Sequence, residues 1–161
     1  MDTIQESADA SIRLSAAIDD LPGLEGRRFG PSGWRTVTQD DVTDYARVSG
    51  DDNPIHLDAG YAAATPFGVT IAHGLLTLGL VVPLMREVFE VTGAGMGINY
   101  GMNKVRFPAP VPVGARVRVS GVVTAVVAVD GGWQVEVVVT FDVEDTPKPA
   151  CVAELVLRYY R

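Results

Sequence analysis

Four long segments of strand-like composition fill the C-terminal half of the chain and restrict its fold to one built on a sheet. Their β-branched composition and frequent apolar/polar alternation favour strands. Asp130-Gly131-Gly132 predicts a hairpin between the second and third segments, and residues 144–149 predict a turn before the fourth. Connections of this kind build an antiparallel sheet. The four expected strands span residues 95–107, 115–129, 133–143 and 150–160.

Ahead of these strands, residues 73–91 predict one long helix. Its first two thirds are apolar on every side, so protein must surround it. Pro83 removes a backbone donor and is expected to bend the helix, and Arg86, Glu87 and Glu90 mark where it reaches the surface. A long apolar helix followed by a run of antiparallel strands indicates an α+β fold in which the sheet curls around the helix.

The N-terminal part is expected to be less regular. Residues 1–20 predict a weakly anchored helical lead-in, and residues 22–33 are rich in the glycine and proline typical of turns. The length of 161 residues suggests one domain. We therefore divide the chain into a lead-in over residues 1–30, without an assigned role, and a single domain over residues 31–161.

A well-marked helix precedes the middle of the chain. Thr38 is a good N-cap residue and Asp41, three residues on, completes a possible capping box, with Asp in place of the preferred Glu. Gly50 is expected to end the helix as its C′ residue. Asp51 therefore emerges just past a helix end. A second, short helix is expected over residues 58–64.

The composition excludes several classes of function. A formal net charge of -7 and a pI near 4.7 argue against nucleic acid as a partner. The single cysteine, Cys151, cannot form an intramolecular disulfide and lies in a valine-rich run typical of a buried thiol. The N-terminus lacks the features of a signal peptide, and the most apolar window, residues 68–85, falls short of the ~20 residues that a spanning helix needs. We expect a cytoplasmic protein with no membrane partner.

Asp51 and His56 are the first candidate catalytic pair. Five residues is not a contact spacing on a helix, but the intervening Asn53-Pro54 can turn the chain and bring the two side chains together. A carboxylate and a neutral imidazole can then hold one water molecule and remove its proton. The alternative is that Asp51 caps a turn and His56 lies on the surface. The neighbouring Asp52 leaves a further choice open, since either aspartate could cap or catalyse. Asn53 is expected to support the turn through its side chain.

His73 and Gly74 form the second candidate element. If the helix begins here, the Gly74 amide is one of its unpaired N-terminal donors and can polarise a carbonyl oxygen. The alternative is that Gly74 merely packs tightly against a strand. A zinc site is not expected, because the chain has only two histidines and no cysteine cluster.

Lys104 and Arg106 form the third candidate element. Strand alternation places both on one face, where they can meet the phosphates of a nucleotide-like handle; the alternative is a solvated sheet face. Residues 93–99 contain G-x-G-x-G but precede a strand instead of opening a helix, so they are rejected as a dinucleotide site.

Two segments together resemble a known family. SGDDNPIH (49–56), followed by ATPFGVTIAHGLLTLGL (64–80), resembles the motif of MaoC-like dehydratases, the R-specific enoyl-CoA hydratases. INYGMNKVRFPAPVPVGARVRV (98–119) resembles the NodN-like branch of that family. The similarity covers residues 33–160. It implies a hotdog fold, with an antiparallel sheet wrapped around one central helix, an overhanging catalytic segment, and a homodimer joined edge to edge.

The resemblance also implies roles for individual residues. Its D-x-N-P-x-H element assigns the catalytic pair to Asp51 and His56, with Asn53 in support, and its A-H-G element assigns the oxyanion donor to the Gly74 amide, with His73 beside it. Side chains beyond that glycine set the acyl-chain depth in the family. The residues of this chain expected to do so are Val82 and Met85.

These inferences lead to a hypothesis of reversible hydration of a trans-2-enoyl-CoA to the (3R)-hydroxyacyl-CoA, as in fatty-acid metabolism, with no metal or redox cofactor. The substrate carrier is CoA or acyl-carrier protein. Two alternatives stay open: a hotdog acyl-CoA thioesterase, and a non-catalytic acyl-binding subunit of a hetero-oligomeric dehydratase. Presence of both the acid and the histidine argues against the second alternative.

Overall fold

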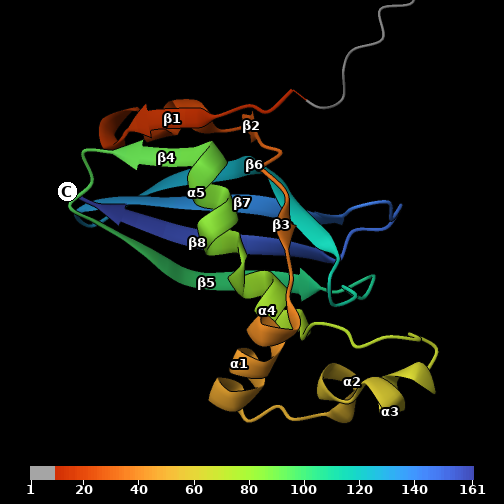
Figure 1. Ribbon diagram of the computed structural model, residues 1–161. Coiled ribbons are helices and arrows are strands. Elements are labelled where there is room, and N and C mark those ends of the chain that lie inside the picture. Colours follow the sequence, from red (N-terminus) through yellow and green to blue (C-terminus); the bar gives the residue numbers. More distant parts are fainter. Residues whose placement is uncertain (1–9) are drawn as a thin grey trace, which may run out of the picture.

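A curved antiparallel sheet forms the body of the protein in this computed structural model, which describes residues 10–161 (Figure 1). The strand order is β2-β6-β7-β8-β5, and β3 also pairs with β6. The hairpin predicted at Asp130-Gly131 is confirmed, since Val129 pairs with Gly132. All four long strands are confirmed to within a residue or two. The strands are β2 (Arg28–Phe29), β3 (Arg35–Thr36), β5 (Met96–Arg106), β6 (Arg116–Val129), β7 (Gly132–Val143) and β8 (Cys151–Tyr160).

The central helix lies across this sheet as two consecutive segments, α4 (Gly74–Gly79) and α5 (Val81–Val88) (Figure 1). They are interrupted at Leu80 because Pro83 has no N–H to donate to the Gly79 carbonyl. The helix predicted over residues 73–91 is confirmed in position, but it ends at Val88, and residues 89–91 belong to a strand instead. Buried helix side chains pack on the valine-rich inner face of the sheet. Those from the helix include Leu78, Val81, Leu84 and Val88, and those from the sheet include Val119, Val137, Val139 and Leu155.

A small parallel pair of strands closes one end of the sheet. β1 (Leu14–Ala17) pairs with β4 (Phe89–Thr92), the segment directly after the central helix. A 3-10 helix, η1 (Ile18–Leu24), follows β1 and contains Pro22. The helix predicted over residues 1–20 is thus wrong for residues 10–17, whereas residues 18–20 begin the 3-10 helix η1, and residues 1–9 lie outside the described part. Leu14, Ile18, Leu21 and Leu24 are buried in the main core, so tertiary pairing overrides the weak local helix pattern.

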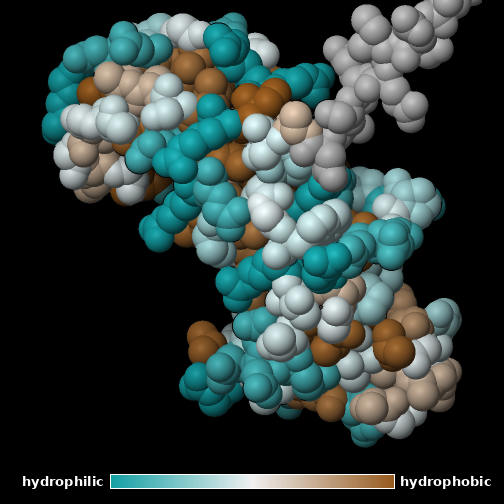
Figure 2. Space-filling view, turned by 45° about the horizontal axis from the view of Figure 1, so that its top comes forward, coloured by the Kyte–Doolittle hydropathy of each residue, from teal (hydrophilic) through white to brown (hydrophobic). Residues whose placement is uncertain are grey.

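Three helices overhang the sheet on the side where α4 begins (Figure 1). They are α1 (Gln39–Ser49), α2 (Pro54–Leu57) and α3 (Ala59–Ala63). The predicted capping box of α1 is confirmed, because Thr38 and Asp41 bond each other reciprocally and Gly50 ends the helix in the left-handed conformation. Figure 2 shows apolar patches over this lower part of the molecule, where Val48, Leu57 and Phe67 are exposed.

Cys151 lies at the start of β8 and is fully buried, as predicted. Burial raises the pKa of its thiol to about 11. Within residues 10–161, no helix is both long and apolar enough to span a bilayer.

Candidate active site

His56 is held in a defined orientation by the short helix α2. Asn53 caps this helix by accepting the Ile55 N–H at 3.2 Å, and Pro54 occupies the first helical turn, a position that needs no N–H donor. The His56 ring is buried, and its Nδ1 lies 2.7 Å from the Ile71 carbonyl oxygen. Since a carbonyl only accepts, Nδ1 carries the proton in this contact. The Nε2 lone pair of a neutral His56 is therefore left for another partner.

His73 links the two halves of the site. It is the N-cap residue of α4 and only 2% exposed. Its Nε2 donates to the Asp51 carbonyl at 2.9 Å, which ties the chain before α2 to the start of the central helix. The His73 and His56 rings stack with their centroids 3.8 Å apart and their planes 31° apart, and Tyr45 packs on His73 at 4.8 Å.

The structure brings Asp51 and His56 together. Asp51 is exposed, yet a carboxylate oxygen of Asp51 and one ring nitrogen from each histidine all lie within 4.8 Å of one another. A water molecule that hydrogen-bonds two atoms at about 2.8 Å each fits such a gap. A shared metal ion fits less well, because ring-nitrogen lone pairs lie in the ring planes and two stacked imidazoles do not direct them at one point.

Gly74 opens onto the same cavity as His56. This cavity has a volume of about 410 Å³ and mostly apolar walls. The Gly74 amide is the first of α4 and has no backbone acceptor within residues 10–161, as expected for a helix start. A Cβ on Gly74 would lie 3.0 Å from the Phe107 ring. Gly74 is therefore tightly packed, as the alternative interpretation of this residue expects, and its amide is nevertheless free of a backbone acceptor among the described residues. The walls are His56, Phe67, Ile71, Ala72, Gly74, Thr77, Phe107, Pro108, Ala109, Pro110, Val111 and Ala150.

The remaining predicted site residues lie elsewhere. Val82 and Met85 line a separate cavity of about 210 Å³ further along α5. Lys104 and Arg106 are exposed on β5 and line neither cavity. The roles assigned to these four residues stay predictions.

Several groups that position the site residues cannot be recognised from the sequence. The Ile71 carbonyl, which orients His56, carries no side-chain signal. Gln39 donates to the His56 carbonyl at 2.9 Å and accepts from the Thr70 hydroxyl at 2.9 Å, so it holds α2 against the segment before α4. No motif marks Gln39, whose role follows only from the docking of α1 on α2. Tyr45 and Phe107 are likewise brought in by tertiary packing.

A curled antiparallel sheet around a central helix, with a helical overhang that carries an acid and a histidine to the helix start, defines the hotdog class of hydratases and dehydratases. The sequence matches the MaoC-like domain over residues 21–145. The chain therefore belongs to the MaoC-like dehydratase family, and both the predicted family and the predicted hotdog fold are confirmed.

Individual relatives agree with this assignment. The chain is 46% identical over 149 residues to 3-hydroxyacyl-thioester dehydratase Z of Mycobacterium tuberculosis, covering 92% of this chain and 99% of the relative. It is 41% identical over 107 residues to nodulation protein N of Rhizobium leguminosarum, covering 63% and 65%. Among solved structures, the R-hydratase PhaJ1 from Pseudomonas aeruginosa superposes with a TM-score of 0.69 at 28% identity, covering 85% and 82%. The chain is thus an enzyme of the hydratase/dehydratase type.

Proposed function

We propose that this enzyme hydrates a trans-2-enoyl-CoA to the (3R)-hydroxyacyl-CoA and catalyses the reverse dehydration. The observation that carries the proposal is that His56 and the Gly74 amide face one apolar cavity, with the Asp51 carboxylate within 4.8 Å of the His56 ring. Base, acid and carbonyl-polarising donor are the groups needed to add water across a conjugated double bond.

Each group has a role that follows from its surroundings. The Gly74 N–H donates a hydrogen bond to the thioester carbonyl oxygen and stabilises the enolate that forms when water attacks C3. His56, whose Nδ1–H is held by Ile71, takes the water proton at Nε2, while Asp51 orients the same water. A proton is then delivered to C2 from this pair. No metal or redox cofactor takes part in this scheme.

The substrate handle is proposed to lie outside the apolar cavity. Lys104 and Arg106 lie on the exposed strand β5, which ends at the Phe107 wall of the cavity, so they can meet the phosphates of CoA or of an acyl-carrier protein. Val82 and Met85 lie beyond Thr77 on the central helix and are proposed to meet the far part of the acyl chain. The cytoplasmic location stays a prediction.

A homodimer is proposed on the basis of uncovered apolar surface. In the described part of the chain, β5 is an edge strand that pairs with β8 alone, and most of its residues are exposed. Long exposed edges with apolar side chains are templates for pairing with another strand. The helix beside it also leaves Leu75 62% exposed and Val82 38% exposed. The apolar side chains exposed on β5 are Met96, Ile98, Tyr100 and Met102.

The test is hydration of crotonyl-CoA by the purified chain, with the product configuration determined by chiral analysis. Asp51→Asn and His56→Ala are expected to lower kcat by about 10²–10⁴-fold, the usual value of positioned acid–base catalysis. Asp52→Asn is the matched control, because it makes the same charge change one residue away and should keep near wild-type kcat. Full activity in Asp51→Asn or His56→Ala would refute the assignment.

The same assay separates the thioesterase alternative. A thioesterase releases free CoA thiol, whereas a hydratase consumes the enoyl group and leaves the thioester intact. If the wild type releases free thiol and His56→Ala does not, the enzyme is a thioesterase and the proposed hydration is refuted. Turnover only after addition of a partner chain would support a non-catalytic subunit instead.

A further inference from the structure

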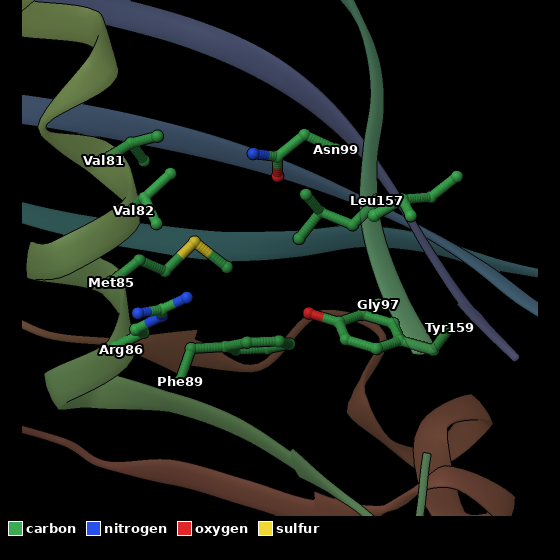
Figure 3. A pocket seen from close by; sticks show the side chains of 10 residues that line it. Val81, Val82, Met85, Arg86, Phe89, Gly97, Asn99, Leu157 and Tyr159 are labelled. Carbon is green, nitrogen blue, oxygen red and sulfur yellow. The ribbon is translucent and has the colours of Figure 1, made fainter. Parts of the chain in front are cut away.

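A second cavity lies between α5, the start of β5 and the end of β8 (Figure 3). It has a volume of about 210 Å³, and its walls are mixed, with apolar side chains beside polar groups. Figure 3 shows the Tyr159 hydroxyl pointing across this space toward the helix that carries Met85 and Arg86. The lining residues are Val81, Val82, Met85, Arg86, Phe89, Gly97, Ile98, Asn99, Leu157 and Tyr159.

Three polar side chains around this cavity have no partner. Within residues 10–161, Arg86, Asn99 and the Tyr159 hydroxyl form no hydrogen bond or ion pair. The two carboxylates nearest to Arg86 in sequence are engaged elsewhere. Glu87 accepts the Gly33 N–H at 2.8 Å, and Glu90 pairs with Arg13 at 2.9 Å. The cavity therefore presents a cation and neutral donors that nothing in the described chain neutralises.

The chain makes room for this arrangement at Gly97. A Cβ at that position would lie 3.0 Å from the Tyr159 ring, so any other residue would push the ring away. Burial also raises the pKa of Tyr159 to about 12. The hydroxyl hence keeps its proton at neutral pH and can donate it in a hydrogen bond.

The second cavity lies further along the central helix than the catalytic one. Thr77 lines the cavity of His56 and Gly74, whereas Val81 and Met85 line the second cavity. These three residues are spaced i, i+4 and i+8 and so follow one face of the helix. Gly74 and Arg86 are twelve residues apart, or about 18 Å along a helix axis. An acyl chain held at the Gly74 amide would have to extend about this distance to bring its terminal group to Arg86.

We propose that the second cavity binds a carboxylate carried on an apolar chain. Val82, Met85 and Leu157 contact the chain, Arg86 pairs with the carboxylate, and Asn99 and Tyr159 donate hydrogen bonds to it. Two sources share this chemistry: the far end of the enzyme's own acyl substrate, and a separate fatty acid. The first source rests on the proposed hydration of enoyl thioesters, and the second does not.

Two measurements on the full chain test the site. In the first, hydration of trans-2-dodecenedioyl-CoA, which ends in a carboxylate, is compared with hydration of trans-2-dodecenoyl-CoA, which ends in a methyl group. We expect the ratio of the two kcat/KM values to favour the carboxylate, and Arg86→Met or Tyr159→Phe to lower it, Arg86→Met by about tenfold. Met keeps the apolar stem of Arg86 without its charge. Arg27→Met, which removes an exposed arginine from a turn far from the cavity, should leave the ratio unchanged.

In the second measurement, binding of dodecanoate is followed by calorimetry without any turnover. Dodecanoate binding that weakens about tenfold in Arg86→Met supports the site with a separate fatty acid as its source. If crotonyl-CoA is not hydrated at all, the proposed function fails while this binding test still decides on the site. If neither the kcat/KM ratio nor dodecanoate affinity depends on Arg86 or Tyr159, the proposal is overturned.

Discussion

The imidazoles of His56 and His73 lie stacked at 3.8 Å, and each donates to a backbone carbonyl, His56 to Ile71 and His73 to Asp51. Both acceptors are main-chain atoms, so the ring orientations are set by the course of the chain. His73 thereby holds the backbone of Asp51, while His56 lines the catalytic cavity. Among the residues that the structure describes, the buried Nδ1 of His73 has no partner.

His73 is therefore expected to act as a positioning residue for Asp51. His73→Phe keeps a ring in the stack but cannot donate to the Asp51 carbonyl. We expect kcat for crotonyl-CoA to fall about tenfold with little change in KM, since one neutral hydrogen bond contributes about 0.5–1.5 kcal/mol. Thermal unfolding should shift little, because the unpartnered Nδ1 is removed as well. Tyr45→Phe is the control, and wild-type kcat in His73→Phe would contradict the prediction.

Gly74 offers a direct test of its amide. It is the first residue of α4, a position that tolerates proline, and His73 already has φ −61° and ψ 139°, the conformation required before proline. Because a side chain at 74 meets Phe107, the test is made in a Phe107→Ala background. There, Gly74→Ala keeps the N–H and Gly74→Pro removes it.

We expect the Gly74→Pro enzyme to have a kcat about 10²–10³-fold below that of the Gly74→Ala enzyme, the range found when an oxyanion donor is lost. Circular dichroism checks that both variants keep their helix content. Equal kcat values for the two would show that the Gly74 amide does not stabilise the reaction.

The parts of the fold that the sequence predicts well are governed by local signals. The capping box of α1 needs only Thr38, Asp41 and the two residues between them. The Asp130-Gly131 turn needs only the two strands that it joins. Long valine-rich strands are equally clear, because their composition holds over ten or more residues. These features depend little on what packs against them.

The failures all depend on partners far away in the chain. β1 exists because residues 14–17 pair with residues 89–92, and neither segment shows this pairing locally. The sequence predicts that Asp51 and His56 lie close together, but it does not predict that His73 joins them. His73 bonds the backbone carbonyl of Asp51, and no side-chain pattern in the sequence indicates such a bond.

The edge strand β5 leads to a prediction about assembly. Met102→Lys places a charge in the middle of the exposed edge, a device that natural proteins use to block strand pairing. We expect it to convert the proposed dimer to a monomer, as measured by light scattering after size-exclusion chromatography. Val127→Lys on β6 is the control, because Val127 is as exposed as Met102, at 51% against 50%, and lies outside the β5 edge. A dimer that persists in Met102→Lys would show that this edge is not the interface.

The capping box of α1 leads to a prediction about pH. The Thr38 N–H, with smaller help from the Thr38 hydroxyl and Arg35, holds the pKa of the Asp41 carboxyl below its usual value. A carboxyl whose folded pKa is depressed stabilises the fold above its unfolded pKa, near 3.9, and this stabilisation is lost as the pH falls through the folded pKa. Asp41→Asn should therefore lower the free energy of unfolding by roughly 0.5 kcal/mol at pH 7, since the group is largely solvent-screened. Asp40→Asn, which removes an exposed carboxylate from the same helix turn, should cost less. Urea unfolding at pH 7 and pH 3 measures both, and a difference between wild type and Asp41→Asn that grows toward pH 3 would contradict the assignment.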